Sequence, residues 1–175
     1  MTEPAPIVRI RHTLQPGDLG MVVHLHGIVY AREYGLDASF EPYVAKPLAE
    51  FAISGAGRLW IAEEGERIVG SIAVVDASDR VGQLRWFLLV PEARGTGLGK
   101  RLLEAALAYA RERDFERLYL WSFSDLSDAL RLYERAGFKA TETKTSVVWG
   151  AERTEVRMDL DLGKRQGPQS RIASD

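Results

Sequence analysis

The chain has 175 residues, and its net charge of −2 comes from 23 basic and 25 acidic side chains. This length suits one domain with its own core, and 46% hydrophobic residues indicate a globular protein. The balanced charge provides no field that would attract nucleic acid or a membrane surface, and the absence of cysteine excludes disulfides, cysteine-bound zinc and a thiol nucleophile.

The N-terminal third predicts one strand and then helices. Residues 7–14 alternate in the manner of a strand. Residues 18–51 are predicted to be helical, with Asp18 as the N-cap and with interruptions at Gly27 and Gly35. No apolar run is long enough to span a bilayer, and the first ten residues lack the order of a signal peptide, so we expect a cytoplasmic protein.

The middle and C-terminal parts alternate strands with two helices. Strand-like runs occupy residues 58–64, 67–78, 82–90, 117–123, 146–150 and 154–162. Apolar residues recur at helical spacing from Leu98 to Tyr109, and a shorter helix is predicted to end before Gly137. The pattern indicates an α/β sandwich around a mixed sheet, with one domain over residues 1–162 and a flexible tail over residues 163–175.

Three glycines within five residues (Gly95, Gly97, Gly99) lie between a buried strand and a helix. The first turn of a helix has unpaired N–H groups and a positive dipole end, and glycine lets an anion approach the backbone closely. A tight turn that packs a helix on a sheet explains one glycine well but three poorly. The spacing fits neither a nucleotide-binding Walker loop nor a dinucleotide fingerprint, because only three residues separate Gly95 from Gly99 and no strand–helix–strand unit begins here.

The hexapeptide Arg94–Gly99 (RGTGLG) resembles the pyrophosphate motif of the GNAT superfamily, whose members transfer acyl groups from acyl-CoA to amines. The stretch LYERAGF, residues 132–138, resembles the second signature of that superfamily. Three further stretches, HGIVYAREYG, LRWFLLVPEARGTGLGKRLL and WGAERTEVRMDLDL, are similar to the acetyltransferase half of bacterial MarR–GNAT fusion proteins. The resemblance implies a mixed, mostly antiparallel central sheet of about seven strands flanked by helices.

The resemblance also implies roles for individual residues. The backbone of residues 87–89 would pair with pantetheine, the N–H groups of residues 95–100 would hold the pyrophosphate, and Tyr133 would protonate the departing thiolate. Leu126 stands where the family often has an asparagine that contacts CoA, so this contact is not expected. The expected residues for the cosubstrate acetyl-CoA are Phe87, Leu88, Leu89, Arg94, Gly95, Thr96, Gly97, Leu98, Gly99 and Lys100.

The general base and the acceptor pocket are less defined by the sequence. Glu33 leads as the base, because the first helical region covers the acceptor cleft in this fold; the alternatives are His24, His26 and a water chain to Glu63 or Glu64. No metal site is expected, since His24 and His26 lack a third ligand. The side chains of Trp86, Trp121 and Trp149 either line an acceptor pocket or belong to the core, and Arg85 binds either an acceptor carboxylate or a surface carboxylate.

We therefore predict an N-acetyltransferase that acts on a primary amine of a small metabolite, an amino acid or a peptide. Two alternatives remain: an acyl-CoA-binding sensor without chemistry, and an enzyme that acetylates protein lysines. Many relatives place a carboxylate on one of the two central strands, but residues 84–90 contain none and Trp121 stands where an acid can stand in the other strand. This missing carboxylate and Leu126 favour the sensor. The expected partners are acetyl-CoA and a small amine, without nucleic acid or membrane. The resemblance also implies a homodimer, because members of the family often pair through their C-terminal strands.

Overall fold

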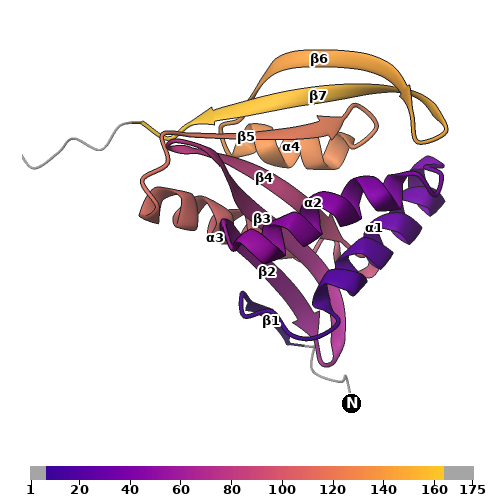
Figure 1. Cartoon of the computed structure of the whole chain (residues 1–175), viewed down its shortest axis with the longest axis horizontal. Helices are drawn as coiled ribbons and strands as arrows, with labels where there is room; N and C mark the ends of the chain where they lie inside the picture. The colour runs from indigo at the N-terminus through magenta and orange to yellow at the C-terminus, as the bar shows by residue number, and fades with distance from the viewer. Residues whose placement is uncertain (1–6, 164–175) are drawn as a thin grey trace, which may run out of the picture.

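A computed structural model describes residues 7–163 as a seven-stranded sheet with helices on both faces (Figure 1). The strand order is β1-β2-β3-β4-β5-β7-β6, and only the β4–β5 pair is parallel. The predicted mixed, mostly antiparallel sheet is therefore confirmed. The strands are β1 (Val8–Arg11), β2 (Gly57–Glu64), β3 (Arg67–Ser78), β4 (Val81–Leu89), β5 (Arg117–Phe123), β6 (Lys139–Val148) and β7 (Ala151–Asp161), and the helices are α1 (Asp18–Tyr34), α2 (Phe40–Ser54), α3 (Leu98–Glu112) and α4 (Ser127–Arg135).

Two apolar clusters, one on each face, hold the helices to the sheet. Alternate residues of β2 show the division, because Leu59 and Ile61 pack with α1 and α2 while Trp60 and Ala62 pack with α3. Figure 1 shows α1 and α2 crossing in front of the sheet. The cluster around α3 also contains Tyr133 of α4. The two helix layers therefore enclose the central strands from both sides.

The structure corrects two details of the helical region. Asp18 is not the N-cap of α1: Gly17 takes that position with a φ of 94°, and the Asp18 carboxylate instead accepts hydrogen bonds from Arg11 and from the Gln15 N–H. The predicted break at Gly27 is wrong, because α1 continues through it. A Cβ at Gly27 would lie 2.5 Å from the Glu41 Oε1 atom, so this glycine allows the close approach of α2.

The closing hairpin is longer than its sequence pattern indicates. The predicted strand at residues 146–150 is in fact the end of β6, which begins at Lys139, and Trp149 and Gly150 form the turn to β7. Both turn residues have positive φ, 53° and 91°, as a two-residue hairpin turn of this hand requires. The first seven residues of β6 are exposed and, apart from Ala140, polar. They show no alternation of apolar residues from which a strand could be predicted, and their pairing with β7 defines the strand.

The limits of the description bear on two predictions. Residues 164–175, which carry most of the predicted tail, lie outside the described residues, and the domain boundary at residue 162 stays a prediction. Among residues 7–163, no helix is both long enough and apolar enough to cross a membrane.

Candidate active site

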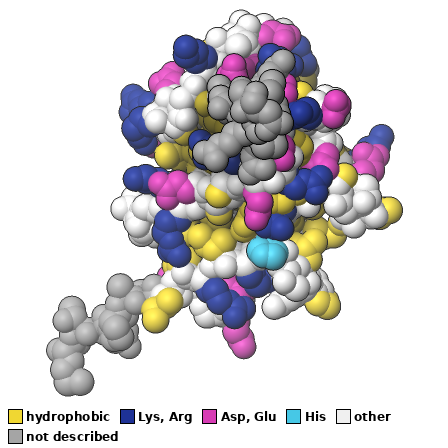
Figure 2. Space-filling model, turned by 90° about the vertical axis from the view of Figure 1, so that its left-hand side faces the viewer, with side chains coloured by type: hydrophobic (Ala, Val, Ile, Leu, Met, Phe, Trp, Pro, Cys, Tyr) yellow, Lys and Arg dark blue, Asp and Glu magenta, His cyan; other side chains and the backbone are white. Residues whose placement is uncertain are grey.

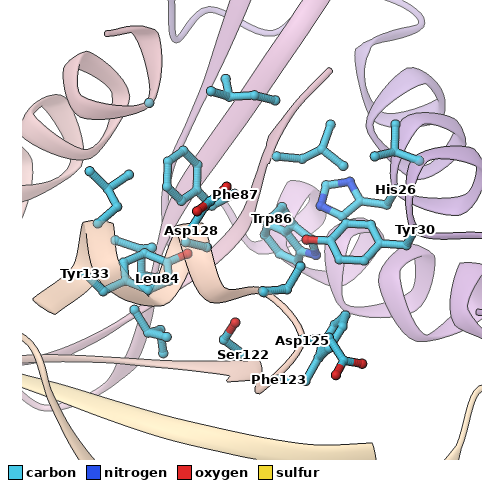
Figure 3. Close-up of a pocket in the computed structure, with 18 of the residues that line it drawn as sticks. His26, Tyr30, Leu84, Trp86, Phe87, Ser122, Phe123, Asp125, Asp128 and Tyr133 are labelled. Atoms are coloured by element: carbon cyan, nitrogen blue, oxygen red, sulfur yellow. The ribbon is translucent and has the colours of Figure 1, made fainter. Parts of the chain in front are cut away.

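The strands β4 and β5 are separated along most of their length, and a cleft lies between them. Their parallel ladder joins only residues 81–83 to residues 117–119. Beyond this point a cavity of about 590 Å³ lies between the strands, with α1, α3 and α4 contributing to its walls (Figure 3). The backbone of residues 87–89, which the resemblance pairs with pantetheine, has no neighbouring strand on the β5 side.

A bulge in β4 accompanies this opening. Ser71 pairs with Leu88 whereas Ala73 pairs with Arg85, so β4 carries one residue more than β3 between these points. The extra length is accommodated at Trp86, which has a φ of 47°. The buried Ser71 hydroxyl donates a 2.7 Å hydrogen bond to the Trp86 carbonyl and satisfies a group that the bulge removes from the ladder. Neither Ser71 nor the bulge was expected, because a bulky tryptophan gives no sequence signal for a left-handed backbone.

The glycine run leads from β4 into α3, as predicted. Gly95 and Gly97 have φ values of 72° and 81°, and a Cβ built on either glycine meets no atom within 4 Å. Gly97 is the residue that caps α3. The backbone at these two positions therefore needs glycine and has open space beside it.

Gly99 serves a different purpose from the other two glycines. A Cβ on Gly99 would lie 3.3 Å from a Leu89 methyl group and 3.6 Å from the Phe87 ring. This glycine lets the start of α3 pack closely on β4, which is the packing role that the sequence assigned to one glycine of the three.

The backbone N–H groups of residues 95–100 lie together between the short helix η1 (Pro91–Ala93) and the first turn of α3. Within the described residues, none of these six groups donates to a main-chain carbonyl or to a side chain, whereas the next amide, of Arg101, donates to the Gly97 carbonyl at 3.1 Å. Gly95, Gly97, Gly99 and Lys100 all line the cavity. A run of free donors at a helix start is a ready anion site.

Arg94 and Glu33, two residues singled out in the sequence, bind each other. Two guanidinium nitrogens of Arg94 donate to the two carboxylate oxygens of Glu33 at 2.9 and 3.0 Å. The same guanidinium donates to the Leu89 carbonyl at 3.1 Å. This ion pair connects the end of α1 to the loop before α3. The Lys100 ammonium lies apart, exposed and 3.7 Å from Glu104.

Tyr133 lies on α4 at the inner wall of the cavity. Its side chain is buried, and its ring centroid is 5.9 Å from that of Phe87. Figure 3 shows the two side chains on the same side of the cavity, beside Leu84. Burial raises the pKa of the Tyr133 hydroxyl far above its usual value, so this phenol is protonated at neutral pH and is a weaker acid than an exposed tyrosine.

The opposite half of the cavity has aromatic walls. Ring centroids lie 4.9 Å apart for Tyr43 and Trp149, 5.0 Å for Phe40 and Trp149, and 5.1 Å for Tyr30 and Phe40. The turn between β6 and β7 carries Trp149 to this position. The three tryptophans considered in the sequence, Trp86, Trp121 and Trp149, all line the cavity.

The alternative bases are placed unequally by the fold. His26 lines the cavity; its Nδ1 donates to the Val22 carbonyl at 2.7 Å, and burial lowers its pKa to about 4. His24 is exposed on another face of α1 and does not line the cavity. Glu63 is bound by Arg9 and Arg11 beside β1, away from the cavity. An imidazole with such a low pKa is a weak base, which leaves Glu33 as the stronger candidate.

Comparison with known proteins identifies the family. Residues 24–138 match the model of the acetyltransferase (GNAT) family, and the chain belongs to that family. It is 36% identical over 137 residues to YjgM of Escherichia coli K12, an uncharacterized N-acetyltransferase, over 74% of this chain and 81% of that protein. It is 32% identical over 95 residues to human N-acetyltransferase 8B, over 51% of this chain and only 42% of that relative.

Solved structures share the fold. The yncA protein of Salmonella typhimurium, solved with its cofactor acetyl-CoA, has a TM-score of 0.73 at 18% identity over 93% of this chain and 98% of its own. Spermidine N-acetyltransferase from Vibrio cholerae, solved with CoA and spermine, has a TM-score of 0.68 at 19% identity over 88% of this chain and 95% of its own.

Proposed function

We propose that this acetyltransferase moves the acetyl group of acetyl-CoA to the primary amine of a small metabolite, an amino acid or a peptide. The observation that carries the proposal is the run of six N–H groups at residues 95–100 that have no acceptor among residues 7–163, beside a cleft between two separated strands. The acetyl-CoA bound by yncA and the CoA and spermine bound by the Vibrio enzyme support the same pairing of substrates.

The cosubstrate would lie along the cleft. Its diphosphate would accept hydrogen bonds from the amides of residues 95–100, helped by the positive end of α3. Its pantetheine amides would pair with the free edge of residues 87–89, as one strand pairs with another. The acetyl carbonyl would then approach the Leu89 N–H, which would stabilise the oxyanion of the tetrahedral intermediate.

The chemistry needs one acid and one base. The amine nitrogen attacks the acetyl carbon, a C–N bond forms, and the C–S bond of the thioester breaks. Tyr133 gives its proton to the departing thiolate, and Glu33 takes the proton that the amine loses. The Tyr133 hydroxyl is protonated at neutral pH, as the first task requires, and its position on the cavity wall rather than its acidity supports this role.

The ion pair with Arg94 governs when Glu33 is available. Both oxygens of Glu33 accept hydrogen bonds from Arg94 in the structure, so the guanidinium competes with the proton of the acceptor for this carboxylate. A diphosphate at residues 95–100 would compete for the Arg94 guanidinium, because arginine also binds phosphate through two hydrogen bonds. Binding of acetyl-CoA would thereby release Glu33 for the acceptor.

A catalytically silent acyl-CoA sensor is the second candidate. The observation that favours it is the same ion pair, which occupies both oxygens of Glu33. Thiol release from acetyl-CoA, measured against a panel of amines, separates the two functions. Amine-dependent release supports the enzyme, while thermal stabilisation by acetyl-CoA without any release supports the sensor. Acetylation of protein lysines would appear as release that only protein substrates stimulate.

The remaining assignments are part of this proposal. We place the enzyme in the cytoplasm, since a chain without cysteine suits a reducing compartment. On the uncovered part of the face in Figure 2, basic and acidic side chains are interspersed, which supports small partners rather than nucleic acid. The homodimer, the single domain over residues 1–162 and the closer likeness to MarR–GNAT fusions stay predictions.

A further inference from the structure

Arg85 lies in the acceptor half of the cavity, on β4 just before the bulge. Its side chain is partly buried and its guanidinium lies 4.9 Å from the centre of the Trp86 ring. It belongs to the lining of the same cavity as the glycine run. The Leu89 N–H, which the acetyl carbonyl would approach, follows four residues later, no more than about 13 Å along a strand. A single small molecule can reach both positions.

Arg85 has no carboxylate partner among the described residues, and no hydrogen bond from it is present there. Three other arginines line the cavity: Arg94 is bound to Glu33, Arg131 is exposed and lies 3.7 Å from Asp128, and Arg135 is exposed. The pocket-facing carboxylate of Glu155 is likewise taken, by Lys144 at 3.2 Å. The sequence left open whether Arg85 forms a surface ion pair, and Arg85 forms no ion pair with any residue among 7–163.

Burial makes this isolation costly. Loss of water lowers the pKa of Arg85 from its usual value, and the groups that act on it from a distance are Tyr43, Tyr119 and Glu50. The Glu50 side chain is exposed on α2 and forms no ion pair with Arg85. A partly buried cation without a counter-ion is less stable than a paired one, and a ligand in the cavity can supply the counter-ion. The planar guanidinium matches a carboxylate through two parallel hydrogen bonds.

We propose that the acceptor is an amine that also carries a carboxylate, an amino acid or a short peptide, and that Arg85 binds this carboxylate. The inference rests on the proposed acetyl transfer at the same site. The acceptor's carboxylate lies on Arg85, and its amine reaches the thioester near the Leu89 N–H. Its side chain lies against the aromatic wall of Phe40, Tyr43 and Trp149. An apolar or aromatic side chain fits these walls best.

The test compares amines that differ only in the carboxylate. Phenylalanine with phenethylamine and tyrosine with tyramine form such pairs, and thiol release from acetyl-CoA gives kcat/KM for each. We expect the parent enzyme to prefer the carboxylated member by about 30-fold, the range of a charged hydrogen-bonded pair. Arg85→Met removes this preference through a higher KM for the amino acids and leaves the plain amines within about 3-fold, while Arg85→Lys retains part of it.

Arg58→Met is the matched control. Arg58 is also partly buried and lies over an aromatic ring, that of Tyr109 at 4.5 Å, but it does not line this cavity. This variant keeps the preference of the parent. Equal rates for both members of each pair in the parent, or equal losses for both in Arg85→Met, overturn the inference.

Binding separates a failure of this inference from a failure of the proposed function. If no amine is acetylated, the acetyl-transfer proposal fails, and calorimetry with phenylalanine and N-acetylphenylalanine in the presence of CoA then reports on Arg85 alone. Binding to the parent that is lost in Arg85→Met supports the carboxylate site. Binding that is absent in the parent, or unchanged in the variant, refutes it.

Discussion

Gly97 offers the sharpest test of the anion site, because the chain contains a matched control in Gly17. Each glycine caps the start of a helix with a left-handed backbone, φ 81° for Gly97 and 94° for Gly17. A Cβ added to either one meets no atom within 4 Å. The two glycines therefore differ mainly in what lies beside them in the complex with the cosubstrate.

Replacement by alanine should cost both variants the same stability. Holding a residue with a Cβ in the left-handed region costs about 1–2 kcal/mol. In a protein of this size, that loss lowers the melting temperature by roughly 2–8 °C. Both Gly97→Ala and Gly17→Ala should show this shift in a thermal unfolding experiment without ligand.

Only Gly97→Ala should also lose affinity for CoA. Its methyl group would project into the open space where a phosphate oxygen approaches the amides of residues 95–100. Loss of one hydrogen bond to a charged group costs about 1.5–3 kcal/mol, or about 10- to 100-fold in Kd. Calorimetric titration of CoA into the two variants measures the difference. Equal Kd values for Gly97→Ala and Gly17→Ala would refute the reasoning.

Four further predictions concern single side chains. Tyr133→Phe should lower kcat by about 100-fold and leave the Kd of acetyl-CoA unchanged; an unaltered kcat removes Tyr133 from the acid role. Glu33→Gln should lower kcat/KM, and a kcat/KM equal to that of the parent excludes this base. Ser71→Ala leaves the Trp86 carbonyl unpaired and should cost about 1–3 kcal/mol in urea unfolding; no loss means that the hydroxyl does not support the bulge. The pKa of His26 is about 4 in the folded protein, below its usual 6.5, so the unfolded chain binds more protons between these values. The free energy of unfolding should therefore fall as pH falls through this window, by about 2 kcal/mol at pH 5. His26→Gln should flatten this part of the stability curve, and an unchanged slope would contradict the burial of a neutral imidazole.

Most of the fold could be predicted from the sequence because the local patterns agree with the tertiary packing. The spacing of apolar residues after Gly97 matches the buried face of α3, and β5 has the predicted limits, Arg117–Phe123. Gly137 follows α4 with a φ of 100°, as expected for a glycine that ends a helix. In these elements, propensity and burial favour the same structure.

Features that depend on long-range contact were not predictable in this way. β6 is an exposed, polar edge strand, so only its pairing with β7 defines it. Gly27 has the sequence signature of a helix breaker, yet it lies inside α1. Glu41 of the neighbouring helix occupies the space where a Cβ would be, which explains the glycine. The bulge at Trp86 depends on Ser71, which is 15 residues distant. The ion pair between Arg94 and Glu33 joins residues 61 positions apart. No local pattern contains such information.

The central claim is that the diphosphate of coenzyme A binds the free amides of residues 95–100. Calorimetric titration of the protein with acetyl-CoA, compared with S-acetylpantetheine, tests it because the second compound lacks the diphosphate together with the 3′-phosphoadenosine. The Gly97→Ala variant separates the contribution of the diphosphate from that of the nucleoside. The account predicts saturable binding of one acetyl-CoA per chain and at least about 10-fold weaker binding of S-acetylpantetheine. Heats of dilution alone with acetyl-CoA, or equal affinities for the two thioesters, would contradict it.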